Sequence, residues 1–66
     1  MNLKTYKLKG LDMYIVNVES KDIAMIQCLL NKIAVTENDL EETEFQVPSN
    51  YSQYFMTLQE IHNAIH

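Results

Sequence analysis

Two histidines near the end of the chain have the spacing of a metal-binding pair. His62 and His66 stand four residues apart, so on a helix both rings would share one face. Two imidazoles bind a metal weakly, whereas a stable zinc site needs about three or four ligands. Glu60 does not share that face, and Cys28 is the only cysteine of the chain. We therefore predict no metal site.

Cys28 is the candidate nucleophile, but its neighbours in the sequence are apolar. Burial among such residues raises the pKa of a thiol and makes it inert. No histidine lies near Cys28 in the sequence, and the single glycine leaves no glycine-rich loop for a phosphate-bearing cofactor. We expect no catalytic residue and no cofactor, and we interpret the protein as a non-enzyme.

Charge is divided unevenly along the chain. Residues 1–34 hold all five lysines against three acids, whereas residues 35–66 hold six acids and no lysine. Most of these acids fall in one short acidic segment, which consists of Glu37, Asp39, Glu41, Glu42 and Glu44. Its order lacks the aspartate spacing and the glycine of a calcium loop. The segment can occupy a basic groove on a partner, or it can simply face water. We take it as a candidate partner-binding surface.

Aromatic residues and lysines form a second candidate site. Tyr51 and Tyr54 could stack on a base, while Lys7 and Lys9 could contact a phosphate. Aromatic residues at helical spacing belong more often to a core. Five lysines, no arginine and a sequence pI of about 4.9 argue against direct binding of nucleic acid. The alternative function is therefore an oligomeric protein that binds a nucleotide-like small ligand.

The segment from Lys21 to about Val35 predicts a helix. Ser20 is a suitable N-cap, and Asp22 lies in the first turn, where the helix dipole favours an anion. A surface helix usually keeps roughly half of its circumference polar. Between residues 23 and 35 the polar residues are only Gln27, Asn31 and Lys32. This helix is apolar on two sides and must bury both.

A second copy of the chain is the most economical partner for such a helix. The chain has 66 residues and a single cysteine, so it cannot form an internal disulfide. Natural chains this short usually depend on disulfides, a metal or oligomerisation. We predict a homodimer or higher oligomer. The residues that we assign to self-association are Met25, Cys28, Leu29 and Lys32.

The remaining elements are predicted from periodicity. Leu3–Lys9 alternates as a half-buried strand, Gly10 marks a turn, and Met13–Val18 reads as a central strand of a hairpin. Thr36 and Asp39 are spaced like a capping box.

A third strand and a second helix are predicted after this turn. Glu42–Val47 alternates again, with Thr43, Phe45 and Val47 inward, and Pro48 ends the strand. From Tyr51 to Ile65 the apolar residues follow helical spacing, with Ser49 or Asn50 as the N-cap. Met56 falls on the polar face of that helix, and we assign it to the partner-binding surface.

The predicted order is β-β-α-β-α in a single domain, residues 1–66. This is a small α+β fold, a three-stranded sheet with two helices packed on it. If the strand around Phe45 pairs with the strand around Ile15, the pairing is parallel. The N-terminus lacks the apolar core of a signal peptide, and no apolar run approaches the length of a membrane span. A lone thiol without an export signal is typical of the cytoplasm.

These features indicate a small acidic, cytoplasmic interaction protein. We expect it to self-associate and to bind or inhibit another macromolecule, most readily a protein. The lack of arginine and the frequent Ile, Asn, Lys and Tyr are typical of an AT-rich genome, such as that of a low-GC bacterium or its phage.

Overall fold

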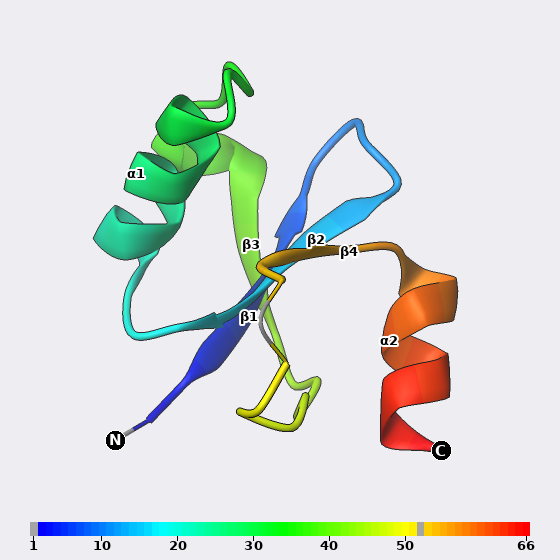
Figure 1. Cartoon of the computed structure of the whole chain (residues 1–66). Helices are drawn as coiled ribbons and strands as arrows, with labels where there is room; N and C mark the ends of the chain where they lie inside the picture. The colour runs from blue at the N-terminus through cyan, green and yellow to red at the C-terminus, as the bar shows by residue number, and fades with distance from the viewer. Residues whose placement is uncertain (1, 52) are drawn as a thin grey trace.

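The computed structural model describes residues 2–51 and 53–66, which form a four-stranded antiparallel sheet with two helices (Figure 1). The elements follow in the order β1 (Lys4–Leu8), β2 (Met13–Val18), α1 (Lys21–Leu30), the 3-10 turn η1 (Glu37–Asp39), β3 (Leu40–Thr43), β4 (Phe55–Met56) and α2 (Leu58–Ile65). The strand order across the sheet is β3-β1-β2-β4. The predicted α+β class is confirmed, but the described residues contain four strands instead of three.

The predicted hairpin of β1 and β2 is confirmed. Gly10 closes it with a φ of 83°, a left-handed conformation that glycine adopts at no steric cost. The Leu11 N–H donates to the Leu8 carbonyl at 3.1 Å. β2 is central, as its apolar composition predicts, because β1 lies on one side of it and β4 on the other.

Asn17 forms a bulge near the end of β2. Lys4 pairs with Val18 and Tyr6 with Ile15, so at this point two β2 residues face one β1 residue. Asn17 has a φ of 56°, which asparagine tolerates better than most residues. Its Nδ2 donates to the carbonyl of Pro48 at 3.0 Å and holds the loop after β3 against β2.

β3 differs in place and pairing from the predicted strand Glu42–Val47. It spans Leu40–Thr43 and pairs antiparallel with β1 and not with β2, so the condition under which a parallel pair was predicted is not met. The reason is local, since the turn from Thr36 to Asp39 delivers the chain at Leu40 directly beside Leu8.

The predicted inward residues Phe45 and Val47 do turn inward, although they lie outside any strand. Val47 is buried, and the Phe45 ring packs edge-on against Tyr14 with a centroid distance of 5.4 Å. The half-buried Thr43 ends β3, and its hydroxyl donates to the Thr5 carbonyl at 3.1 Å.

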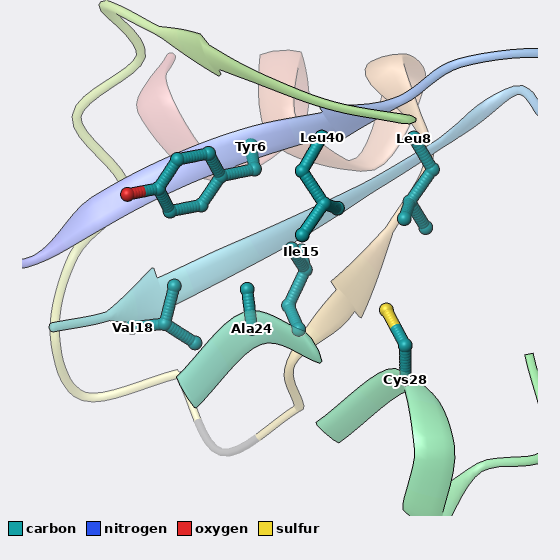
Figure 2. Packing of buried hydrophobic residues seen from close by; sticks show 7 residues of the cluster. All are labelled: Tyr6, Leu8, Ile15, Val18, Ala24, Cys28 and Leu40. Atoms are coloured by element: carbon teal, nitrogen blue, oxygen red, sulfur yellow. The ribbon is translucent and has the colours of Figure 1, made fainter. Parts of the chain in front are cut away.

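α1 and α2 cover opposite faces of the sheet. On one face Ala24 and Cys28 of α1 point into a cluster of sheet residues (Figure 2). The sheet residues of this cluster are Tyr6, Leu8, Ile15, Val18 and Leu40. On the other face Ile61 of α2 packs with Val47 and with sheet residues Tyr14, Val16 and Met56. Each helix therefore closes its own small core.

α2 is shorter than the predicted helix from Tyr51 to Ile65, of which Ser52 lies outside the described residues. It begins at Leu58 with Thr57 as the N-cap. The Glu60 N–H donates to Thr57 Oγ1 at 3.2 Å, and the Thr57 N–H donates to Glu60 Oε1 at 3.0 Å. This capping box starts the helix after Phe55–Met56, which forms β4 by pairing with β2.

α1 also ends earlier than Val35. The Ile33 N–H donates to the Cys28 carbonyl at 2.8 Å, and the Lys32 N–H donates to the Leu29 carbonyl at 3.0 Å. Lys32 has a φ of 60°. This is the Schellman arrangement that ends helices, although glycine is the usual residue at the left-handed position. It turns Ile33 back onto the core beside Cys28.

Candidate interaction surface on helix α1

α1 carries its largest apolar side chains on the side away from the sheet. Ala24 and Cys28, one turn apart, are buried against the sheet. At about 3.6 residues per turn, Ile26 lies on the opposite side of the helix. Ile26 is 52% exposed, Leu29 76% and Leu30 69%. Together with Ile23, which is 40% exposed, these residues form what we call the outer α1 face.

The polar residues of α1 do not break this face. Gln27 is half-buried at the flank of the helix, and Asn31 is the C-cap, whose Nδ2 donates to the Gln27 carbonyl at 2.9 Å. Asp22 lies in the first turn, one turn before Ile26, and so stands at the N-terminal end of the outer α1 face. Single exposed apolar residues are common on proteins, but contiguous ones mark sites of interaction.

A shallow hollow extends the outer α1 face toward the loop that follows the helix. Its volume is about 250 Å³. The hollow is lined by Met25, Ile26, Leu29, Ile33, Ala34 and Val35. All of these side chains are apolar, so the exposed apolar surface continues past the end of the helix at Leu30.

The residues assigned to self-association from the sequence separate into two groups. Leu29 lies on the outer α1 face, Met25 lines the hollow, and Lys32 is exposed just beyond the helix. Cys28 is buried against the sheet, so its assignment to a contact surface is wrong. The same burial raises the pKa of the Cys28 thiol, as expected for an inert cysteine.

Ile23, Ile26 and Leu30 were not among the residues assigned to self-association. The one local signal for the inner side is the pair of small residues Ala24 and Cys28, spaced one turn apart, because small side chains allow a helix to approach a sheet closely. This signal applies only once a sheet packs against the helix, and the sequence alone does not select that side.

The acidic segment lies beside the lysines of β1. Glu42 Oε1 lies 3.8 Å from Lys4 Nζ, and Glu41 pairs in register with Lys7. Both glutamates are exposed, where an ion pair contributes about 0–1 kcal/mol. The charges that are separated along the sequence are therefore neighbours in the sheet. Glu37 and Glu44 are also exposed.

Asp39 has a structural role within the acidic segment. Its carboxylate accepts from the Thr36 N–H at 2.8 Å and from the Thr36 hydroxyl at 3.0 Å. These bonds, the backbone one first, lower the pKa of Asp39 from its ordinary value. The predicted capping box is thus confirmed.

Met56 does not belong to an exposed surface. It was placed on the polar face of a helix, but it lies in β4 opposite Tyr14 and is buried. Its burial in the core beneath α2 overturns that placement.

The lysines and tyrosines proposed for a ligand do not meet. Lys7 Nζ lies 5.4 Å above the Tyr14 ring and donates to the Leu11 carbonyl at 3.2 Å. Lys9 lies beside β3, where its N–H donates to the Asp39 carbonyl at 2.8 Å. The Tyr54 carbonyl accepts from the Val16 N–H just before β4, which is separated from β1 by β2, and the Tyr51 N–H donates to the Pro48 carbonyl in the preceding loop.

His62 and His66 share one face of α2, as predicted, with ring centroids 4.5 Å apart. They line one side of a broad hollow of about 660 Å³, together with Leu58 and Ile65. Among residues 2–51 and 53–66 we find no group of three or more His, Cys, Asp or Glu side chains placed to hold a metal ion.

Two broader findings complete the description. No helix in the described part of the chain has the length and apolar character needed to cross a membrane. No protein-family model, curated protein or solved structure matches the sequence or the fold.

Proposed function

We propose that this protein is a non-enzymatic interaction protein that self-associates through the outer α1 face. The observation that supports the proposal is the exposure of Ile26, Leu29 and Leu30 on one contiguous surface. Removing apolar area from water is favourable by about 25 cal/mol per Å². A partner that covers these side chains therefore gains a large part of its binding free energy from them.

A second copy of the chain fits this surface well. It carries the same apolar face, and two copies related by a twofold axis can cover both faces at once. A domain of this size buries only about 60% of the surface of its unfolded chain, so its stability is marginal without a partner. Self-association therefore also stabilises the fold.

We further propose that the acidic edge of the sheet contacts another macromolecule with a basic surface. β3 is an edge strand; Glu41 and Glu42 are exposed on it, and Glu44 is exposed just after it. Lysines of β1 offset part of this charge on the side of β3 that faces β1. The proposed contact therefore uses the other side of β3, which is the outer edge of the sheet. Reversing all three charges should weaken capture of the partner without lowering the melting temperature. Unchanged capture would contradict the acidic-edge proposal.

The competing function, binding of a nucleotide-like ligand between Tyr51, Tyr54, Lys7 and Lys9, has less support. It requires phosphate contacts from Lys7 in β1 and Lys9 just after it, together with base contacts from the loop before β4, and β2 lies between β1 and β4. We therefore favour the interaction protein.

The solution mass tests self-association directly. Light scattering after size exclusion should give a multiple of 7.7 kDa for the wild type. Leu29→Lys places a charge in the centre of the proposed contact and should reduce the mass to that of one chain. Leu58→Lys on α2 is the control, since Leu58 is also an exposed leucine of a helix, at 46% against 76% for Leu29. It should leave the mass unchanged.

Two results would contradict the proposal. The first is a wild type that stays a single chain at high concentration. The second is an assembly that Leu29→Lys leaves intact, because the contact would then lie elsewhere on the molecule.

A further inference from the structure

We infer that two copies pair through their outer α1 faces with the helices antiparallel, crossing between Ile26 and Leu29. The inference rests on the proposed self-association and specifies its geometry. It also assigns Asp22 and Lys32 as the charged residues that select this orientation.

The apolar centre of the contact comes from the outer α1 face itself. Ile26 points directly away from the sheet, and Leu29 is the most exposed of the large apolar residues of α1. A twofold axis between them brings Ile26 of each copy against Leu29 of the other. Leu30 and Ile23 then lie on the flank of the same contact.

The two exposed charges that flank the outer α1 face have opposite signs, and Lys21, the first residue of α1, is half-buried. Asp22 lies in the first turn of α1, one turn before Ile26, and is exposed. Lys32 is exposed directly after the helix. Asp22 lies about one and a half helical turns before the midpoint between Ile26 and Leu29, and Lys32 follows the C-cap Asn31 at the other end of the helix. In an antiparallel pair, Asp22 of each copy therefore lies opposite Lys32 of the other.

A parallel pair would reverse this complementarity. It would bring Asp22 against Asp22 and Lys32 against Lys32, and like charges at close range repel. It would also align the two helix dipoles, with positive N-terminal ends side by side. Both effects favour the antiparallel arrangement.

Charge exchange tests the orientation. Asp22→Lys and Lys32→Asp each replace two attractive contacts per dimer by two repulsive ones. We expect each to raise the dissociation constant of the dimer roughly tenfold at low salt, measured by sedimentation equilibrium. The double variant Asp22→Lys/Lys32→Asp restores opposite charges and should return the constant to within about threefold of the wild type.

The double variant also controls for helix stability. A lysine in the first turn disfavours the helix by itself, and the double variant carries the same lysine. Recovery of dimerisation can therefore come only from the restored pairs between copies. Aspartate at position 32 is a reasonable substitute because it tolerates the left-handed backbone there.

Disulfide formation gives a second measurement that does not depend on charge. Ile26→Cys and Leu29→Cys proteins, each in a Cys28→Ser background, are mixed in equal amounts and oxidised. An antiparallel pair should yield mainly the mixed dimer, since position 26 faces position 29. A parallel pair would yield mainly the two homodimers.

The outcomes separate the two proposals. Single charge variants with unchanged dissociation constants, or a predominance of homodimeric disulfides, would overturn the antiparallel arrangement while self-association stands. A wild type that does not associate would overturn both.

Discussion

α1 and α2 perform the same task on opposite faces of the sheet, but they differ in where their apolar residues point. α2 buries Ile61 and exposes Gln59, Glu60 and Asn63 on its polar side, while Leu58 at its start and Ile65 at its end are about half exposed. α1 buries only the small residues Ala24 and Cys28 and leaves its largest side chains outside. α2 is therefore a surface helix with one polar side, whereas α1 is apolar on both sides.

This difference supports the proposal that a partner covers α1. A ten-residue helix has little stability by itself and depends on packing. The packing against the sheet uses few of the apolar atoms of α1. The remaining apolar atoms gain favourable free energy only when something else covers them. The contrast between the helices is therefore the strongest indication of a partner.

The largest expected difference between the helices is in the free energy of unfolding that is lost when a large apolar side chain is replaced by alanine. Ile61→Ala removes buried methylene groups from the core beneath α2 and should lower the free energy of unfolding by about 2–5 kcal/mol. Ile26→Ala, made in the monomeric Leu29→Lys protein, should change it by less than about 0.5 kcal/mol. Urea unfolding measures both.

Ile61→Val is the gentler variant for a protein of marginal stability and should cost about 0.5–1.5 kcal/mol. Should Ile26→Ala prove as costly as Ile61→Ala in the monomeric protein, the outer α1 face would be packed by its own chain, and the comparison of the helices would fail.

The N-caps of α1 and α2 should differ by a smaller amount. The Ser20 hydroxyl accepts from the Ile23 N–H at 3.2 Å. The Thr57 hydroxyl accepts from the Glu60 N–H, and in addition the Thr57 N–H donates to the Glu60 carboxylate. Ser20→Ala and Thr57→Ala should each lower the free energy of unfolding by about 1 kcal/mol, because each removes one bond to a backbone N–H of the first turn. Thr57→Ala keeps the backbone N–H that donates to the Glu60 carboxylate, so Glu60→Ala is the variant that removes this reciprocal bond at the start of α2. A Glu60→Ala protein as stable as the wild type in thermal unfolding would argue that the reciprocal bond contributes nothing.

Lys32 allows a gain of stability at the end of α1. Its φ of 60° is unfavourable for a residue with a side chain. Lys32→Gly removes that strain but adds freedom to the unfolded chain, so we expect a net gain of about 0.5 kcal/mol. The measurement belongs in the monomeric Leu29→Lys background, where loss of the lysine cannot weaken pairing. A loss of stability there would show that Lys32 has another favourable contact.

The smallest predicted effect is the pH dependence of the two capping carboxylates. Hydrogen bonds from Thr36 lower the pKa of Asp39, and hydrogen bonds from Thr57 and Gln53 lower the pKa of Glu60. A folded pKa below the unfolded one stabilises the protein above the unfolded pKa. That stability is lost as the pH falls through the folded pKa, at about pH 4 and below. Asp39→Asn and Glu60→Gln should flatten this loss in acid titrations of thermal stability, and an unchanged slope would contradict it.

Local signals predicted several elements correctly because neighbouring residues alone determine them. Gly10 closes the hairpin through its own backbone freedom. Ser20 starts α1, and Thr36 with Asp39 forms the capped turn, through bonds that span three residues. The apolar run Met13–Val18 predicted a strand buried on both faces, and β2 is such a strand.

Other features depend on contacts between distant residues. Phe55 fits the apolar helical spacing that begins at Tyr51, and Met56 was placed on the polar face of the same helix, yet both form β4 because β2 offers a free edge beside them. The acids of residues 39–42 lie beside the lysines of β1 only because β3 returns to that strand. The periodicity of one segment does not predict which other strand that segment pairs with.

The sequence by itself determined that α1 is a helix with apolar residues on two sides, since side-chain types and helical spacing settle both properties. Only the tertiary structure decided which side faces the sheet. The hydrophobic effect has no direction, so either side could have been buried. Close approach to the sheet then selected Ala24 and Cys28 for the inside, and it left Ile26, Leu29 and Leu30 facing outward.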